Sequence, residues 1–317
     1  MREANFQGGV WPVMVTPFTK ENKVDDKALK PLVEWYIEEG VNGLFAVCQS
    51  SEMFTLTLEE RIGLAKKVVE YTHGRVPVIA SGHISDRIED QIFELQQMAA
   101  TGIDALILIT NRMAKEEESD DVWIRNTEQI LEALPADMHL GLYECPYPYK
   151  RILSEKVTKW CADTGRFYFL KDTSCDMKSI RMKLAACQGS HLKLYNANTA
   201  TLLESLRAGA YGYSGVMANM HPGLYRILCE NYRSRDREVE KLEEFLTMCA
   251  LIERQCYPVN AKYYLQLEQV GMDLFSRVKD YRELSETYKK EVIMLRDLSI
   301  EAEKTWERRR PHAAVAY

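Results

Sequence analysis

Residues 167–171, Phe167-Tyr168-Phe169-Leu170-Lys171, form a continuous aromatic and aliphatic run that ends in a lysine. A run of this kind is typical of a β-strand buried on both faces, as in a parallel sheet covered by helices. Similar short runs, each bounded by Gly, Pro or polar residues, recur through the first two thirds of the chain. We expect eight strands, at Val10–Thr16, Gly43–Val47, Val76–Ala80, Ala105–Thr110, His139–Tyr143, Phe167–Lys171, Leu192–Tyr195 and Gly212–Val216.

Between these runs the apolar residues recur at three- and four-residue spacing, which predicts amphipathic helices. Eight alternating strands and helices favour an α/β fold, the closed (β/α)8 TIM barrel, which a chain of 317 residues can hold. An open doubly wound sheet is the alternative, but no Gly-x-Gly-x-x-Gly follows the first strand. The clearest helical segments are Leu58–Tyr71, Asp86–Ala100, Val122–Ala133, Ser154–Ala162 and Thr199–Ala208.

The pattern changes from about Arg235 onward, where Glu-, Lys- and Arg-rich segments carry helical spacing and no further strand signal. We therefore expect two domains. Residues 1–234 form the catalytic barrel, and residues 235–317 form an appended C-terminal helical domain.

Composition restricts the possible partners. The 41 Lys and Arg against 47 Asp and Glu give a net charge of −6, which does not favour nucleic acid or an anionic membrane. The longest strongly apolar run, Ala105–Ile109, is far shorter than the roughly 20 residues that span a bilayer. Without an apolar secretory signal we expect a cytoplasmic protein. Eight cysteines without a Cys-x-x-Cys pair predict reduced thiols and no metal site.

In barrels of this kind the active site lies at the carboxyl ends of the strands. Lys171 ends an apolar run, so its amine is expected to project into the barrel mouth. Burial lowers the pKa of a lysine and leaves the neutral amine that attacks carbonyls to form a Schiff base. The alternative is an exposed lysine, or one paired with the adjacent Asp172.

Two other strand ends carry groups that suit this chemistry. Tyr143 ends the preceding strand, where a phenol beside the lysine can transfer protons. Ser50 lies in a polar turn after the second strand, where hydroxyl and backbone N–H groups can hold a carboxylate. Taken singly, a packed tyrosine and an ordinary strand-to-helix loop explain these residues equally well.

Taken together, four short motifs resemble the pyruvate-dependent class I aldolase superfamily, the dihydrodipicolinate synthase and N-acetylneuraminate lyase family. The resemblance covers essentially the whole chain, and the tyrosine precedes the lysine by 28 positions. The matching pieces are Val15-Thr16-Pro17-Phe18, Glu52 at the close of its turn, Tyr143-x-x-Pro146 and Lys171-Asp172-Thr173.

The resemblance implies a Schiff-base lyase or aldolase that needs no cofactor. It makes or breaks a carbon–carbon bond in a 2-oxo acid, with pyruvate and an aldehyde as small-molecule substrates. It also implies a homotetramer, assembled as a dimer of dimers. By position, Lys171 resembles the Schiff-base lysine and Tyr143 the proton-relay tyrosine. The expected substrate-binding residues are Gln49, Ser50, Ser51, Thr16, Thr173 and Ser214.

Three departures from the family pattern affect the site. The family's Gly-Thr-Thr-Gly-Glu turn reads Cys48-Gln49-Ser50-Ser51-Glu52, so we expect Cys48 or Ser51 to adopt any positive φ that the turn needs. Met113 replaces the relay tyrosine that the synthase receives from a neighbouring subunit. Pro148 replaces the arginine that the synthase uses for aspartate semialdehyde. We therefore expect an enzyme other than dihydrodipicolinate synthase, acting on a 2-keto-3-deoxy sugar acid.

Three other functions stay open. A dehydratase of keto-deoxy sugar acids uses the same imine. A non-catalytic binder of the same fold would explain the altered turn, although Lys171 and Tyr143 argue against it. A metal-dependent barrel enzyme would use acidic and imidazole groups at the strand ends, with Glu52, His83, Glu144 and Asp172 as its ligands.

Overall fold

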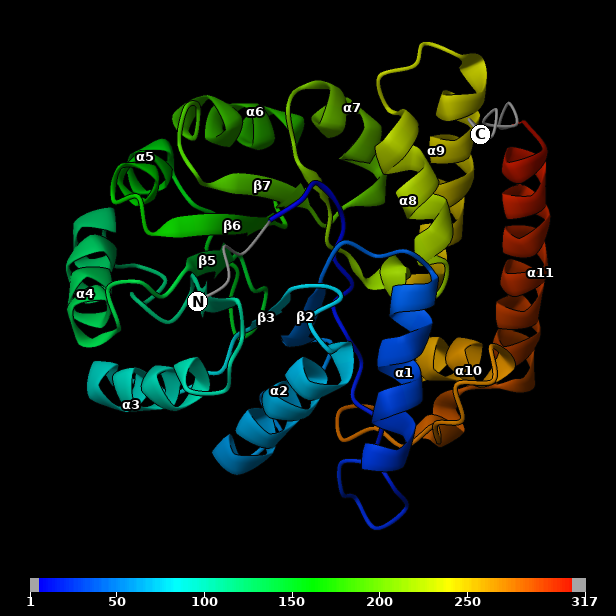
Figure 1. Ribbon diagram of the computed structural model, residues 1–317, viewed down its shortest axis with the longest axis horizontal. Coiled ribbons are helices and arrows are strands. Elements are labelled where there is room, and N and C mark those ends of the chain that lie inside the picture. Colours follow the sequence, from blue (N-terminus) through cyan, green and yellow to red (C-terminus); the bar gives the residue numbers. More distant parts are fainter. Residues whose placement is uncertain (1–5, 310–317) are drawn as a thin grey trace, which may run out of the picture.

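The described part of the chain forms eight parallel strands; β3 to β7 each lie between the strands that precede and follow them in the chain, and β8 pairs with β1 (Figure 1). The sheet order is β1-β8-β7-β6-β5-β4-β3-β2, and a bridge between Val13 and Phe45 joins its two edges. This is the expected TIM barrel. The computed structural model describes residues 6–309. Its strands are β1 (Gly9–Val10), β2 (Leu44–Val47), β3 (Val78–Ala80), β4 (Ala105–Ile109), β5 (Leu140–Tyr143), β6 (Phe167–Asp172), β7 (Lys193–Asn196) and β8 (Gly212–Tyr213).

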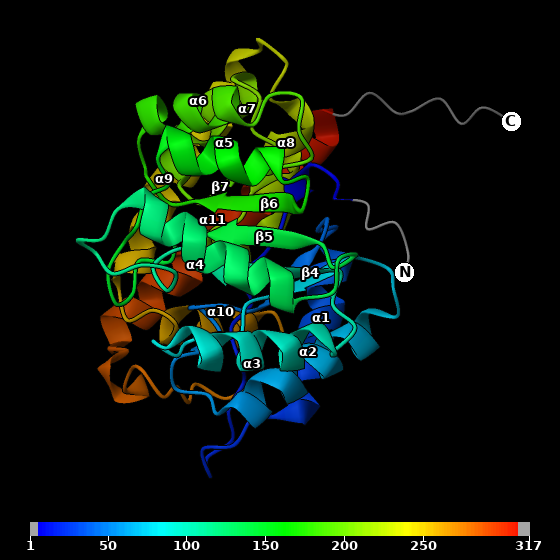
Figure 2. The same cartoon turned by 90° about the vertical axis from the view of Figure 1, so that its left-hand side faces the viewer.

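Helices cover the outside of the sheet, and Figure 2 shows α3 to α6 ranged along it. Several begin at side-chain caps, for example α2, where Thr57 and Glu60 form a capping box. The barrel helices are α1 (Asp26–Glu38), α2 (Leu58–Thr72), α3 (Ile88–Ala99), α4 (Asp120–Ala133), α5 (Glu155–Asp163), α6 (Met177–Ala186), η1 (Thr199–Thr201), α7 (Leu202–Arg207), η2 (Val216–Asn219) and α8 (Pro222–Asn231).

The first and last strands are shorter than the sequence predicts. The first was expected to run to Thr16, but Pro12 has no N–H to donate, and beyond it only the Val13 bridge continues the pairing. The last was expected to reach Val216, yet the chain turns into η2 at that residue. The carboxyl ends of these strands are therefore irregular loops.

Aromatic side chains fill the barrel interior. Trp11 packs against Phe169 and Tyr195, with ring centroids 5.4 and 5.6 Å away. Gly43 is needed beside them, because a Cβ there would lie 2.3 Å from the Trp11 ring. These side chains fill the barrel interior, and a cavity lies at the carboxyl ends of the strands.

The C-terminal part of the chain is helical, as expected, and packs against the barrel over α7 and α8 (Figure 1). Leu246, Leu265 and Val292 belong to the same buried cluster as the strands. The boundary at 234/235 therefore stays a prediction. The elements are α9 (Arg237–Cys249), η3 (Ala250–Arg254), α10 (Val259–Leu267), η4 (Tyr281–Glu283) and α11 (Glu286–Arg309).

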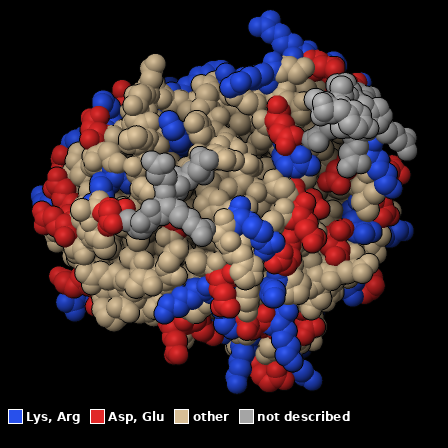
Figure 3. Space-filling view, viewed as in Figure 1, with Lys and Arg blue, Asp and Glu red and all other residues tan. Residues whose placement is uncertain are grey.

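On the face shown in Figure 3, acidic and basic side chains are interspersed. Among the residues that the structure describes, none of the helices is both long and apolar enough for a membrane span.

Candidate active site

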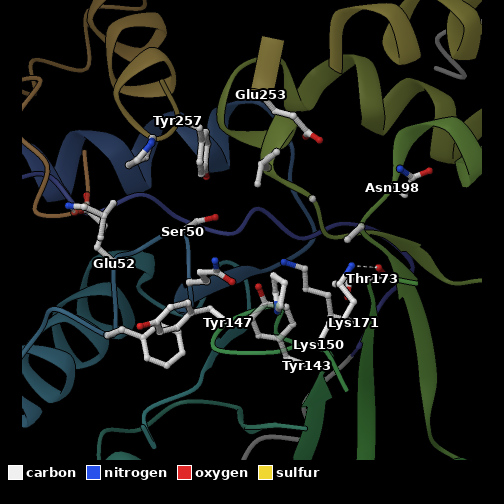
Figure 4. A pocket seen from close by; sticks show the side chains of 18 of the residues that line it. Ser50, Glu52, Tyr143, Tyr147, Lys150, Lys171, Thr173, Asn198, Glu253 and Tyr257 are labelled. Atoms are coloured by element: carbon white, nitrogen blue, oxygen red, sulfur yellow. Dashed lines mark hydrogen bonds between the residues drawn. The ribbon is translucent and has the colours of Figure 1, made fainter. Parts of the chain in front are cut away.

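A cavity of about 790 Å³ opens at the carboxyl ends of the strands. Figure 4 shows that its wall comes from two sides. Lys171 and Tyr143 rise from the barrel, whereas Glu253 and Tyr257 enter from the C-terminal segment opposite them. The sequence-predicted residues that line it are Gln49, Ser50, Tyr143, Lys171 and Thr173.

Lys171 lies near the end of β6 with its side chain 4% exposed. Its Nζ is 4.3 Å from the centroid of the Tyr143 ring. Burial lowers the pKa of Lys171 to about 8. The next residue, Asp172, points to the other face of the strand, where its Oδ2 lies 2.5 Å from Nζ of Lys183. The alternative of an exposed lysine, or one paired with Asp172, is therefore wrong.

A comparison with the other two buried lysines shows what is special about Lys171. Lys183 contacts the carboxylates of Glu144 and Asp172, and Lys262 lies 2.9 Å from Oε1 of Glu52. Within the described chain, no carboxylate lies at ion-pair distance from Lys171. The Lys171 amine faces the cavity instead, and burial outweighs the attraction of Glu253, so the pKa of the lysine is lowered.

Tyr143 is held beside Lys171 by the sheet itself, because the two residues are direct partners in the β5–β6 ladder. The Tyr143 ring packs edge-on against Phe45, with 5.7 Å between the centroids. Burial raises the pKa of Tyr143 well above its usual value, so the phenol keeps its proton. Tyr143 can therefore donate a proton to an oxygen bound near Lys171.

The turn after β2 keeps two of its expected residues in the cavity. Gln49 and Ser50 line it, but Ser51 does not. The Ser51 hydroxyl instead lies 2.7 Å from both the N and the O of Cys48 and closes the turn. The expectation of a positive φ at Cys48 or Ser51 is wrong, since Glu52 adopts it, at 63°.

Two further expected substrate-binding residues also lie outside the cavity lining. The Thr16 hydroxyl donates to the carbonyl of Ser51 at 2.8 Å, and the Ser214 hydroxyl donates to that of Trp11 at 2.9 Å. Both side chains are fully buried and satisfy backbone groups of irregular strand ends. They support the wall of the site rather than form its surface.

The loop after β4 turns away from the cavity. Met113 is fully buried, and Arg112 forms an ion pair with Asp86. Neither residue lines the site. Pro148 is also absent from the lining, but Lys150, two residues later, belongs to it. The cavity wall thus holds a cation that the sequence reasoning missed.

The four groups considered as metal ligands do not converge. Glu52 binds Lys262, while Glu144 and Asp172 share Lys183. The ring nitrogens of His83 contact Gln91 and the backbone N–H of Ile109. Each group is thus committed to a structural partner. In residues 6–309 no set of three such side chains is placed to hold an ion.

The lining residues that the sequence reasoning missed include three charged side chains and a phenol: Lys150, Glu253, Arg254 and Tyr257. Three of them come from η3 and the segment before α10, far beyond the last barrel strand. A search restricted to strand ends could not find them. The chain carries no local signal that this segment folds back over the barrel.

Both the sequence and the fold are similar to those of known proteins. The model of the dihydrodipicolinate synthetase family matches residues 6–295. The 4-hydroxy-tetrahydrodipicolinate synthase of Thioalkalivibrio sulfidiphilus is 29% identical over 269 residues, covering 83% of this chain and 88% of that enzyme. The enzyme of the same name from Bacillus subtilis is 26% identical over 274 residues, covering 85% and 91%.

Solved structures show the same fold. YagE of Escherichia coli K12, a protein of the dihydrodipicolinic acid synthase family in complex with pyruvate, matches with a TM-score of 0.81 and 21% identity. The match covers 95% of this chain and 99% of YagE. CdNal of Clostridium difficile, in complex with mannosamine, matches with a TM-score of 0.82 and 14% identity, covering 92% and 99%.

Proposed function

The chain belongs to the dihydrodipicolinate synthetase family, and on that basis we propose that it is a pyruvate-dependent aldolase or lyase acting through a Schiff base at Lys171. The observation that carries the proposal is the buried amine of Lys171, which faces the cavity without a carboxylate partner among the described residues. A lysine in such surroundings is partly neutral near pH 7 and can attack a ketone.

The reaction follows from the positions of the side chains. The Lys171 amine attacks C2 of pyruvate and loses one proton to the ketone oxygen; the Tyr143 phenol gives that oxygen its second proton, and it leaves as water. The resulting iminium withdraws electrons from C3. The Tyr143 phenolate takes a proton from C3 to give the enamine, and returns it to the aldehyde oxygen when the enamine attacks the aldehyde carbon. Cleavage is the reverse of this step. Gln49 and Ser50 are the candidates for holding the pyruvyl carboxylate.

We infer that the second substrate is a hydroxylated aldehyde, so that the product is a 2-keto-3-deoxy sugar acid rather than the dipicolinate precursor. Pro148 stands where the synthase has its arginine, and Glu253 adds a carboxylate to the mouth of the cavity. An acidic group there repels a second carboxylate and accepts hydrogen bonds from hydroxyls. A dehydratase of the same class of sugar acid would use the same imine.

Condensation of pyruvate with aspartate semialdehyde is a second candidate. The relatives from T. sulfidiphilus and B. subtilis carry the name of that synthase. Lys150 and Arg254 also line the cavity and could bind the carboxylate of the semialdehyde. A cytoplasmic location and assembly as a dimer of dimers stay predictions for either activity.

The test is intact-mass analysis after borohydride reduction with pyruvate, followed by peptide mapping. We expect one adduct, at Lys171, and turnover of hydroxylated aldehydes with pyruvate. Glu253→Gln should then favour aspartate semialdehyde relative to the wild type. Efficient condensation of aspartate semialdehyde by the wild-type chain would establish the second candidate. Turnover with no adduct at Lys171 would overturn the Schiff-base mechanism itself.

A further inference from the structure

A second phenol faces the cavity from the C-terminal segment. Tyr257 lies between η3 and α10, is half-buried, and lines the same cavity as Lys171 and Tyr143. Figure 4 shows its ring entering opposite Tyr143, with Ser50 between the two. The family motifs in the sequence gave this tyrosine no role.

Two side chains contact the Tyr257 hydroxyl, Asn219 and Ser50. Nδ2 of Asn219 lies 3.2 Å from the Tyr257 oxygen and 2.9 Å from the carbonyls of Val13 and Val216. An amide nitrogen can only donate, so the Tyr257 oxygen accepts from Nδ2, which also serves the two carbonyls. The Tyr257 hydroxyl is also hydrogen-bonded to the Ser50 hydroxyl, and either of the two can donate.

We propose that Tyr257 completes, within a single chain, a proton relay that runs from Tyr257 through Ser50 to Tyr143. This inference rests on the proposed Schiff-base function. It removes the need for a tyrosine from a neighbouring subunit, whose usual position is taken here by the buried Met113. Tyr257 is thus a positioning and proton-supplying residue that acts through Ser50.

The relay balances during imine formation. The ketone oxygen must leave as water with two protons, one from the Lys171 nitrogen, which keeps its other hydrogen in the iminium, and one from the relay. Tyr143 gives its proton to that oxygen, Ser50 passes one to Tyr143, and Tyr257 passes one to Ser50. The proton released from nitrogen returns along the same hydroxyls in the opposite order, and the proton later lost from C3 restores the second one. Burial raises the pKa of both phenols, so both begin the cycle protonated.

The experiment compares Tyr257→Phe with the wild type in two assays that need no aldehyde. One follows the rate of borohydride-trappable adduct at saturating pyruvate, and the other follows exchange of the pyruvate C3 hydrogens with deuterium. We expect both rates to fall by about 10- to 1,000-fold, up to the usual contribution of a positioned proton-transfer group. The fraction of Lys171 trapped at equilibrium and the melting temperature should stay close to wild type.

Tyr263→Phe is the matched control, since this tyrosine lies on α10 outside the cavity lining and should keep both rates unchanged. Because the relay acts in series, Ser50→Ala combined with Tyr257→Phe should be no slower than Ser50→Ala alone. Rates for Tyr257→Phe within twofold of wild type, or additive losses in the double variant, would overturn the relay alone. A wild-type chain that forms no adduct would overturn the proposed function and the relay together.

Discussion

Lys171 is a lysine whose surroundings oppose its charge. Its Nζ lies over the rings of Tyr143 and Phe45, at 4.3 and 6.0 Å from their centroids. Aromatic faces offer some attraction to an ammonium, but the lowered pKa shows that burial outweighs it. The same burial that prepares the amine for attack therefore makes the folded chain less stable at neutral pH.

This cost predicts a pH dependence of stability. The pKa of Lys171 is about 8 in the folded chain and 10.5 when the lysine is not buried, as in the unfolded chain. Between pH 8 and pH 10.5 the unfolded chain therefore binds more protons than the folded chain. The contribution of Lys171 to stability therefore rises from pH 8 to pH 10.5, and below pH 8 the full penalty, about 3 kcal/mol, is present. Lys171→Met should stabilise the protein at pH 6.5, with a gain that shrinks as the pH approaches 10.5.

Urea denaturation of the wild type and of Lys171→Met between pH 6.5 and about pH 10.5 measures this gain in the free energy of unfolding. In a separate assay, adduct formation by the wild type should slow about tenfold per pH unit below about pH 8, because the neutral amine becomes that much rarer. A destabilised Lys171→Met at pH 6.5 would mean that a buried partner neutralises the ammonium.

At the scale of elements, one lysine fixes two strands of the site. Glu144 follows Tyr143 on β5, and Asp172 follows Lys171 on β6. Both carboxylates meet the ammonium of Lys183 on α6, and all three side chains are fully buried. Glu144 also accepts hydrogen bonds from the N–H groups of Leu153 and Thr173, at 2.9 and 3.0 Å. This cluster holds the two strand ends at the spacing that the chemistry needs.

Lys183→Met should destabilise the fold by about 3 to 5 kcal/mol at pH 7, because it leaves two buried carboxylates without a cation. Burial raises the pKa of Glu144, so protonation should relieve part of the loss at pH 5. The urea midpoint at both pH values measures this. Lys159→Met, which removes an exposed pair with Asp163, should change stability by less than about 1 kcal/mol. Equal effects of the two substitutions would contradict a buried cluster.

At the scale of the whole molecule, the C-terminal segment is part of the site. Glu52 accepts from Lys262, from the Ser276 hydroxyl at 3.0 Å and from the Arg277 N–H at 2.6 Å. The turn that carries Ser50 is thereby tied to residues more than two hundred positions away. The barrel and the helical part therefore share both a buried core and the wall of the cavity.

A chain ending at residue 234 should accordingly form the pyruvate adduct more slowly than the wild type, or not at all. It lacks the partners of the buried Glu52 and one wall of the cavity. Circular dichroism distinguishes failure to fold from a folded barrel without a site, and borohydride trapping measures the adduct. If a folded chain of residues 1–234 reacted at the wild-type rate, the barrel would be an independent catalytic domain and the C-terminal segment would not be part of the site.

The sequence by itself determined the barrel, because the evidence for each strand and helix lies within a short segment. Burial on both faces makes each strand a continuous apolar run, and burial on one face gives each helix its three- and four-residue spacing. It also singled out Lys171 and Tyr143, since parallel strands bring their carboxyl ends together. Long-range contacts decided the rest. The pairing of Asp172 with Lys183 depends on where α6 packs, and the Glu52–Lys262 pair joins residues 210 positions apart. The entry of Tyr257 into the cavity depends on the path of the C-terminal helices, which no local pattern encodes.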